Sequence, residues 1–381
     1  MSLPLKSKIL GHDLHAFLSL VFAGRGTAKI DSAPGAGKSK GIEAFARLMN
    51  KVFENDGGYG LFVLDMSKAN LADLNGYLMP RDKTDTDAYG NTIEVTHGRY
   101  SYPYWLYDWF TGKPAYKFKH GLIVLEEWGQ GDGEVKRGCA PLIYDRRLGE
   151  WKFPEFDMVV LSNRPQDRSG VTKEYDFIIN RWTEAELQPT LEGFLEVSHI
   201  LGLLPLTQAF ASRNEKELFH EAEVPKVQGS WMTQRSLHKL DDIVQAALAK
   251  GMAFTDPLLI AALSGTVGPD NARRYVAFAD ARTKIPAVSA IIADPMGTPI
   301  PAELDVLSFL VFDLAAKTKH ENVEKIFQYV RRMKSDMAVT YFHAACTRDD
   351  TLVGTKQFSA FAMDNLGVLT AVAARKARKQ P

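Results

Sequence analysis

The chain has 381 residues, and its 46 lysines and arginines balance its 46 aspartates and glutamates. A net charge of zero argues against a protein whose whole surface binds nucleic acid or an anionic membrane, although it allows a local basic patch. A hydrophobic fraction of 45% and a charged fraction of 24% exclude the disordered, collagen-like and coiled-coil classes. The length exceeds that of a single core, so two or three domains are expected.

Targeting and redox signals are sparse along the chain. The apolar stretch at 17–23 is short and lacks the small-residue cleavage site of a signal peptide, and the most apolar stretch, 258–263, is too short to span a bilayer. The two cysteines, Cys139 and Cys346, provide neither a disulfide framework nor a CxxC metal site. We therefore expect a cytoplasmic protein in a reducing compartment, with no membrane partner.

The first 190 residues alternate between helical periodicity and short apolar runs. Amphipathic helices are predicted at 12–22, 41–53 and 135–144. Buried strands are predicted at 27–30, 59–65, 121–125, 157–162 and 183–187, with a hairpin at 148–154. Strands that alternate with helices indicate a three-layer α/β core with a parallel sheet. The polar, tyrosine-rich segment 81–119 is predicted to be an insertion into that core.

After Pro189 the pattern becomes helical throughout. Helices are predicted at 236–250, 257–263, 271–282, 302–317 and 322–334. Four prolines crowd the stretch 286–301, which is predicted to link two helical modules.

A glycine-rich loop joins the first core strand to the next helix. Its residues are Ser32, Ala33, Pro34, Gly35, Ala36, Gly37, Lys38 and Ser39. The two glycines allow successive backbone N–H groups to face phosphate oxygens, and the helix start adds a partial positive charge. Lys38 is suited to bridge the β- and γ-phosphates of a nucleotide, and the Ser39 hydroxyl is suited to ligate Mg²⁺. Ser32 stands where the usual pattern has its first glycine; the alternative is a simple helix-capping turn.

Two further strand ends carry polar groups. The apolar run 122–125 ends in Glu126 and Glu127, and the strand at 157–162 is followed by Asn163. Because buried parallel strands end at the ligand crevice, Glu126 is assigned to the metal and Glu127 to the base that activates water. Asn163 is suited to bind the attacking water or the γ-phosphate. Glu126 is one methylene longer than the aspartate usual at this position, so metal geometry or turnover is open.

Two arginines have the chemistry to stabilise phosphate charge. Arg181 precedes the last core strand, and Arg235 lies at the start of a helix in the helical region. A guanidinium can act on its own subunit's nucleotide or on that of a neighbour. Most arginines are surface solubilisers, so these two stand out only because of the preceding motifs.

Together these residues resemble AAA+ ATPases, and most closely the MoxR-like branch. The loop SAPGAGKS is similar to Walker A and LIVLEE to Walker B. Asn163 resembles sensor 1, Arg181 the arginine finger donated to the adjacent subunit, and Arg235 sensor 2 on a helical lid. The segments YDRRLGEWKFP at 144–154 and LSGTVGPDNARRYVAF at 263–278 resemble the hairpin before sensor 1 and a lid helix pair of this branch.

The resemblance implies an ATPase that uses ATP and Mg²⁺ and assembles into a homo-oligomeric, hexameric ring that remodels or chaperones a protein client. A von Willebrand factor A-domain protein is a typical partner of this branch. The implied domains are an N-terminal helix at 1–24, the AAA+ core at 25–190, a helical lid at 191–300 and a helical C-terminal extension at 301–381.

Other functions stay open at this point. A DNA-directed motor or loader of the same fold needs a basic channel, which the neutral total charge disfavours without excluding. A structural or regulatory module that binds ATP without turning it over is supported only by Glu126. A small-molecule kinase is disfavoured by the long helical half of the chain.

Overall fold

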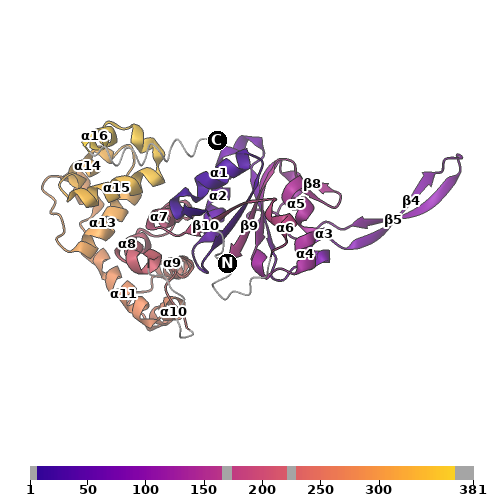
Figure 1. Ribbon diagram of the computed structural model, residues 1–381. Helices are drawn as coiled ribbons and strands as arrows, with labels where there is room; N and C mark the ends of the chain where they lie inside the picture. Colours follow the sequence, from indigo (N-terminus) through magenta and orange to yellow (C-terminus); the bar gives the residue numbers. More distant parts are fainter. Residues whose placement is uncertain (1–6, 165–173, 221–228, 365–381) are drawn as a thin grey trace. The chain divides into compact units, whose positions relative to one another are not determined.

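A computed structural model describes residues 7–164, 174–220 and 229–364 (Figure 1). The chain forms two compact units, which we describe separately. The first unit falls within Met1–Ile9, Leu14–Pro34 and Lys38–Gln188; the second falls within Leu10–Asp13, Gly35–Gly37 and Pro189–Pro381. Residues 1–6 of the predicted N-terminal helix and 365–381 of the predicted extension lie outside the described residues.

The first unit is built on a six-stranded sheet with the order β1-β10-β2-β9-β6-β3. Its strands are β1 (Lys8–Leu10), β2 (Thr27–Ser32), β3 (Tyr59–Asp65), β6 (His120–Glu126), β9 (Phe156–Asn163) and β10 (Thr183–Gln188). The pairs from β10 to β3 are all parallel. All five predicted strands are present, and the predicted α/β fold class with a parallel sheet is confirmed.

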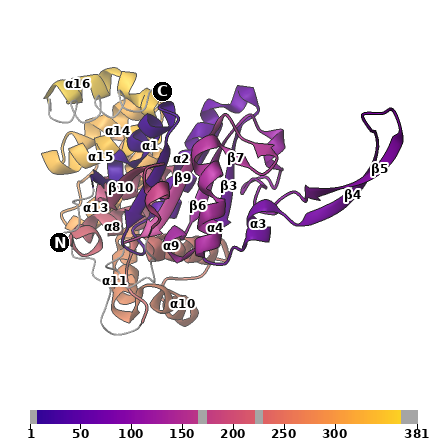
Figure 2. The same ribbon diagram turned by 45° about the vertical axis from the view of Figure 1, so that its right-hand side comes forward.

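Helices cover both faces of this sheet (Figures 1 and 2). On one face, α1 (Leu14–Ala23) and α2 (Lys38–Val52) pack with Leu122 and Val124 of β6. On the other face, α4 (Gly133–Gly138), α5 (Ala140–Asp145) and α6 (Asp176–Ile179) pack with Ile123 and Leu125. Alternate residues of one strand thus enter two different cores, as the pleat of a buried strand requires.

The helix predicted at 135–144 is wrong in one respect, because it consists of the two short helices α4 and α5. The interruption falls at Cys139, between Gly138 and Pro141. Glycine weakens a helix interior, and proline has no N–H to donate to the preceding turn. The predicted hairpin at 148–154 is present as β7 (Arg147–Leu148) and β8 (Trp151–Lys152).

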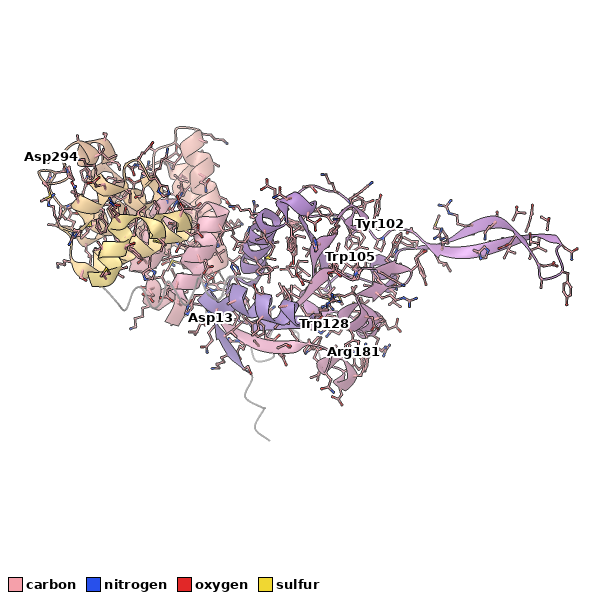
Figure 3. The ribbon with its side chains drawn as sticks, turned by 90° about the horizontal axis from the view of Figure 1, so that it is seen from above. Asp13, Tyr102, Trp105, Trp128, Arg181 and Asp294 are labelled. Atoms are coloured by element: carbon pink, nitrogen blue, oxygen red, sulfur yellow. The ribbon has the colours of Figure 1, made fainter. Side chains whose placement is uncertain are left out.

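The segment after α3 (Leu71–Asn75) forms a long antiparallel hairpin that extends away from the sheet (Figures 1 and 2). Its strands are β4 (Leu78–Thr86) and β5 (Thr92–Tyr100), and nearly all of their residues are exposed. Tyr102 and Trp105 lie where the hairpin joins the core (Figure 3). Trp105 is buried there and donates its indole N–H to the Leu74 carbonyl at 3.1 Å, whereas Trp109 is exposed.

The second unit is helical where it is described. Its α-helices are α7 (Leu191–Leu201), α8 (Pro205–Arg213), α9 (Gln234–Ala249), α10 (Pro257–Val267), α11 (Pro269–Ala279), α12 (Val288–Ala293), α13 (Leu304–Lys317), α14 (Val323–Val330), α15 (Ser335–Arg348) and α16 (Lys356–Asp364). One hydrophobic cluster reaches from Phe194 to Ala362. The proline-rich stretch predicted as a linker contains α12, whose Ile291 joins this cluster. No helix within the described ranges has the length and apolar character needed to cross a bilayer.

A histidine of α7 should make the stability of this unit depend on pH. Both ring nitrogens of His199 are shielded from solvent, and neither has a hydrogen-bond partner among the described residues. Burial, with a smaller contribution from the charge of Arg348, lowers the pKa of His199 to about 3 from its ordinary 6.5, although Glu196 opposes the shift. Between about pH 3 and pH 6.5 the unfolded chain therefore binds more protons at this histidine than the folded chain, so stability falls as the pH is lowered through that range.

We expect the free energy of unfolding to fall by about 2 kcal/mol between pH 7 and pH 5 through this one group. Denaturant titrations at the two pH values measure this loss. His199→Leu should be the more stable protein at pH 5 and lack that part of the pH dependence, whereas His97→Leu on the exposed hairpin should retain it. An equal loss in wild type and His199→Leu would contradict the assignment.

Candidate functional site

Parallel pairing brings the predicted site residues at the strand ends to one edge of the sheet. Ser32 at the end of β2 is in register with Asn163 at the end of β9, and Glu126 at the end of β6 is in register with Asp65 of β3. Helix α2 begins at Lys38, so the glycine-rich loop lies between the end of β2 and the start of a helix. The site therefore lies at the carboxyl edge of the strands, where ligands of parallel sheets are found.

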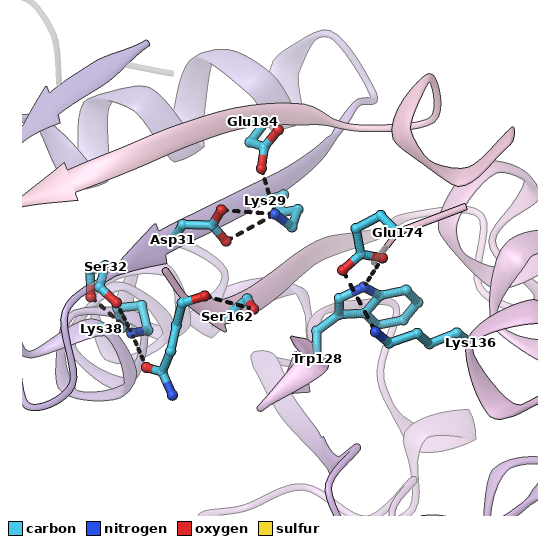
Figure 4. A network of polar contacts seen from close by, with 10 residues as sticks. Lys29, Asp31, Ser32, Lys38, Trp128, Lys136, Ser162, Glu174 and Glu184 are labelled. Atoms are coloured by element: carbon cyan, nitrogen blue, oxygen red, sulfur yellow. Dashed lines mark hydrogen bonds and ion pairs between the residues drawn. The ribbon is translucent and has the colours of Figure 1, made fainter. Parts of the chain in front are cut away.

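The loop from Ala33 to Gly37 has the backbone that its glycines predict. Gly35 and Gly37 have φ angles of +78° and +86°, which disfavour a side chain at either position. Ser32 is not among the described non-glycine residues with positive φ. Its hydroxyl accepts a hydrogen bond from Lys38 Nζ at 2.8 Å (Figure 4). Serine is therefore compatible with the position where the usual motif has its first glycine.

A chain of hydrogen bonds joins the loop to the predicted base. Lys38 Nζ donates to Asn163 Oδ1 at 3.1 Å, and Asn163 Nδ2 donates to Glu127 Oε2 at 3.0 Å. Asn163 thus uses both ends of its amide to connect an ammonium with a carboxylate. One side chain thus holds both the Lys38 ammonium, which would bind a terminal phosphate, and the Glu127 carboxylate, which would accept a proton.

The residues predicted to bind metal also meet. The Ser39 hydroxyl donates to Glu126 Oε1, so a glutamate at this strand end reaches the loop despite its extra methylene. A hydroxyl and a carboxylate are the hard oxygen donors that Mg²⁺ prefers. The pair fits that ion, and Ser39 and Glu126 would hold it together with water and phosphate oxygens. When bound there, Mg²⁺ would neutralise phosphate charge.

Glu127 has an unusual backbone. Its φ and ψ are +51° and +36°, a left-handed conformation that few non-glycine residues adopt. The next residue, Trp128, is completely buried and begins a short 3₁₀ turn. The left-handed turn directs the chain from β6 into the core directly after the carboxylate, so packing at Trp128 fixes the position of Glu127.

Arg181 makes its contacts elsewhere in the first unit. Its Nη1 donates to the carbonyl of Ala140 in α5 at 2.9 Å, and its guanidinium lies 5.7 Å from the ring centroid of Tyr144 and 5.9 Å from that of Phe177. Within the described residues, no hydrogen bond or ion pair joins it to Lys38, Asn163 or Glu127. Figure 3 labels Arg181 and the nearby Trp128.

Arg235 belongs to the second unit, which also contains Gly35–Gly37. It follows the first residue of α9, whose start is capped by Thr233 and Ser236. Its backbone N–H donates to the Gly35 carbonyl at 3.3 Å, and its side chain is exposed. Its predicted role in sensing phosphate stays a prediction.

Sequence reasoning missed the charges inside β2. Lys29 and Asp31 are 4% and 1% exposed, and Lys29 Nζ lies 2.9 Å from each carboxylate oxygen of Asp31. The signal was present, since two charges separated by one residue in an otherwise buried strand need partners there. Arg146, in the segment similar to a pre-sensor hairpin, is another missed group. Its guanidinium donates to the carbonyls of Gly26 and Phe156, so it has a structural role.

Comparisons with known proteins give weak similarities. No family model and no curated protein matches the chain. Among solved structures it is similar to NtrX from Brucella abortus in complex with ATP, at 13% identity over 90% of this chain and 69% of that chain, with a TM-score of 0.34. The ADP complex of NtrX gives 14% identity, 93% and 67% coverage and a TM-score of 0.33. Hsp104 with ATPγS and FITC casein is 12% identical over 75% of this chain, with a TM-score of 0.30. The match covers only 48% of the Hsp104 chain. At these scores the solved structures assign no family to the chain.

Proposed function

We propose that this chain is an AAA+ ATPase of the MoxR-like type that binds ATP with Mg²⁺ and hydrolyses it. The observation that carries the proposal is the connected set of contacts at the sheet edge. At the start of α2, Lys38 contacts Asn163 at the end of β9, and Ser39 contacts Glu126 at the end of β6. Asn163 in turn contacts Glu127. Hydrolysis requires a carboxylate such as that of Glu127 close to the ammonium that binds the phosphates, whereas nucleotide binding alone does not.

The roles divide as follows. Backbone N–H groups of the loop and Lys38 bind and orient the phosphates, and Ser39 with Glu126 holds the metal. Glu127 orients the attacking water and accepts its proton, while Asn163 fixes the carboxylate that does so. Arg181 stabilises charge on the nucleotide of a neighbouring subunit, and Arg235 senses the phosphate state within its own chain.

Assembly and partners belong to the same proposal. A homo-oligomeric ring, hexameric by the family resemblance, would bring Arg181 to a neighbour's site, and such a cytoplasmic ring would act on a protein client or with a von Willebrand factor A-domain protein. The hairpin supports a protein contact over a nucleic-acid contact. Its Lys83 pairs with Asp85 at 3.0 Å, and its Arg99 pairs with Glu150 at 2.9 Å, which leaves less positive charge for phosphate.

Removing the loop ammonium tests nucleotide binding. Lys38→Ala should weaken ATP binding by about 10- to 100-fold, because a charged hydrogen bond to phosphate contributes about 1.5–3 kcal/mol. Titration calorimetry with ATP and Mg²⁺ measures the change. Lys40→Ala is the matched control, since Lys40 lies two residues along the same helix and pairs with Glu43 at 2.8 Å. Equal affinities for wild type and Lys38→Ala would refute the site.

A further inference from the structure

A cluster of buried charges and two tryptophans lies in the first unit near the candidate site, and Figure 4 shows all of it except Trp182. We call it the buried cluster. Its members are Lys29, Asp31, Trp128, Lys136, Glu174, Trp182 and Glu184. Lys136 and Asp31 are each 1% exposed and Trp128 is fully enclosed. Such burial is costly for charged groups, so the arrangement calls for an explanation.

One half of the buried cluster is centred on Lys29 of β2. Its ammonium donates to both carboxylate oxygens of Asp31 at 2.9 Å and to Glu184 of β10 at 2.5 Å. The same ammonium lies 5.4 Å from the ring centroid of Trp182, within the range of a cation–π contact. Strand β2 is thereby tied through charge to the segment that begins β10.

The other half is centred on Trp128. Its indole N–H donates to Glu174 at 2.8 Å, and Lys136 of α4 lies 3.6 Å from that carboxylate and 5.5 Å from the Trp128 ring. The two halves meet where Trp128 and Trp182 contact edge to face, with ring centroids 5.7 Å apart and planes at 89°. This is the favoured geometry for an aromatic pair.

Three members of the buried cluster are covalently next to a residue of the predicted site. Asp31 precedes Ser32 of the phosphate loop, Trp128 follows Glu127, and Trp182 follows Arg181. Arg181 and Glu127 make no direct hydrogen bond among the described residues, yet the residues that follow them touch. Replacing buried ion pairs with apolar groups is often neutral or stabilising, so stability alone does not account for these charges.

We propose that the buried cluster couples Arg181 to Glu127, with Trp182 and Trp128 as the positioning residues. A shift of the Arg181 segment moves Trp182 against Trp128, and Trp128 in turn sets the left-handed turn at Glu127. This inference rests on the proposed function and deepens it by naming how the site is regulated. Arg181 would contact the nucleotide of a neighbouring subunit. The state of that nucleotide would then influence Glu127 in the subunit that carries Arg181, through the contact between Trp182 and Trp128.

The kinetic test replaces each indole. Trp128→Phe and Trp182→Phe should each lower kcat for ATP by about 10- to 100-fold, because a misplacement of about 1 Å at the reacting groups costs that much. KM should change far less, since Lys38 and Ser39 keep their contacts. The double variant should lose no more than the worse single variant, because the two residues act as a unit. Trp151→Phe is the control, since its ring packs on Tyr102 outside the buried cluster.

A spectroscopic test does not depend on hydrolysis. The chain has six tryptophans, so labelling with 5-fluorotryptophan gives a small set of ¹⁹F resonances that single Trp→Phe variants assign. Arg181→Lys should shift the Trp128 and Trp182 resonances while those of Trp105 and Trp151 stay in place. Arg181 is partly exposed, so this variant should fold.

The outcomes separate the two proposals. Loss of kcat in both Trp→Phe variants together with a shifted Trp128 resonance supports the coupling. A shifted resonance in a protein that does not hydrolyse ATP keeps the coupling and refutes the proposed function. An unshifted Trp128 resonance, or full kcat in folded Trp128→Phe, refutes the coupling and leaves the ATPase proposal intact.

Discussion

Glu127→Gln is expected to lower the rate of ATP hydrolysis by about 10²- to 10⁴-fold, the usual contribution of a general base. The amide of the glutamine cannot accept the proton of the attacking water. Glutamine has the same size as glutamate, so it should keep the hydrogen bond from Asn163, which is 3.0 Å long in the wild-type protein. ATP affinity should stay close to that of wild type, because Lys38 and Ser39 keep their hydrogen bonds to Asn163 and Glu126. Phosphate release at saturating ATP measures the rate, and titration calorimetry measures the affinity.

The control for this variant is Glu134→Gln, which changes the same chemical group on the exposed start of α4. It should hydrolyse ATP at the wild-type rate. Equal single-turnover rates for wild type and Glu127→Gln would identify a nucleotide-binding module without turnover and contradict the role of Glu127. Because Glu127→Gln retains ATP, light scattering after size exclusion, with and without ATP, would also report whether the nucleotide drives ring assembly.

Arg181→Ala is expected to reduce hydrolysis by about 10³- to 10⁵-fold, as loss of an arginine that stabilises transition-state charge does. The substitution removes a hydrogen bond to the Ala140 carbonyl and the contacts of the guanidinium with the partly exposed rings of Tyr144 and Phe177. We therefore expect little loss of stability. Nucleotide affinity should be largely retained. Phosphate release and calorimetry again separate rate from binding, and thermal unfolding checks the fold.

Mixing variants decides whether Arg181 acts on a neighbour. Arg181→Ala keeps an intact nucleotide site, whereas Lys38→Ala keeps an intact arginine, so a mixed ring contains some complete interfaces. An equimolar mixture should therefore hydrolyse ATP faster than either variant alone. A mixture no faster than the mean of its parts, or a monomer that turns over at the full rate, would show that the arginine does not act between subunits.

The conformation of the glycine-rich loop could be predicted from sequence because it is set locally. Gly35 and Gly37 are adjacent to Lys38 along the chain, and the order of strand, loop and helix follows from hydrophobic periodicity. The strand ends at Glu126 and Asn163 were predicted by the same reasoning, since buried parallel strands all end at one edge. Their contacts with Ser39 and Lys38 follow from that common edge.

The hairpin β4–β5 was less accessible to sequence reasoning. Its polar composition predicts only an insertion, although Ile93 and Val95 alternate with Thr92, Glu94 and Thr96 in the pattern of a strand. The single helix predicted at 135–144 failed for a different reason, because its apolar periodicity continues across Gly138 and Pro141, the residues that interrupt the helix.

The sequence by itself determined the order of the α/β core, the glycine-rich loop and the identity of the polar groups at the strand ends, because each depends on neighbours within a few residues. Only the tertiary structure decided that Asn163 joins Lys38 to Glu127, and that Trp182 meets Trp128 above Lys29. These contacts join segments 36–153 residues apart, through strand pairing and burial that no local pattern encodes. The physical reason is that register and packing place distant side chains together, whereas periodicity reports only which face each residue occupies.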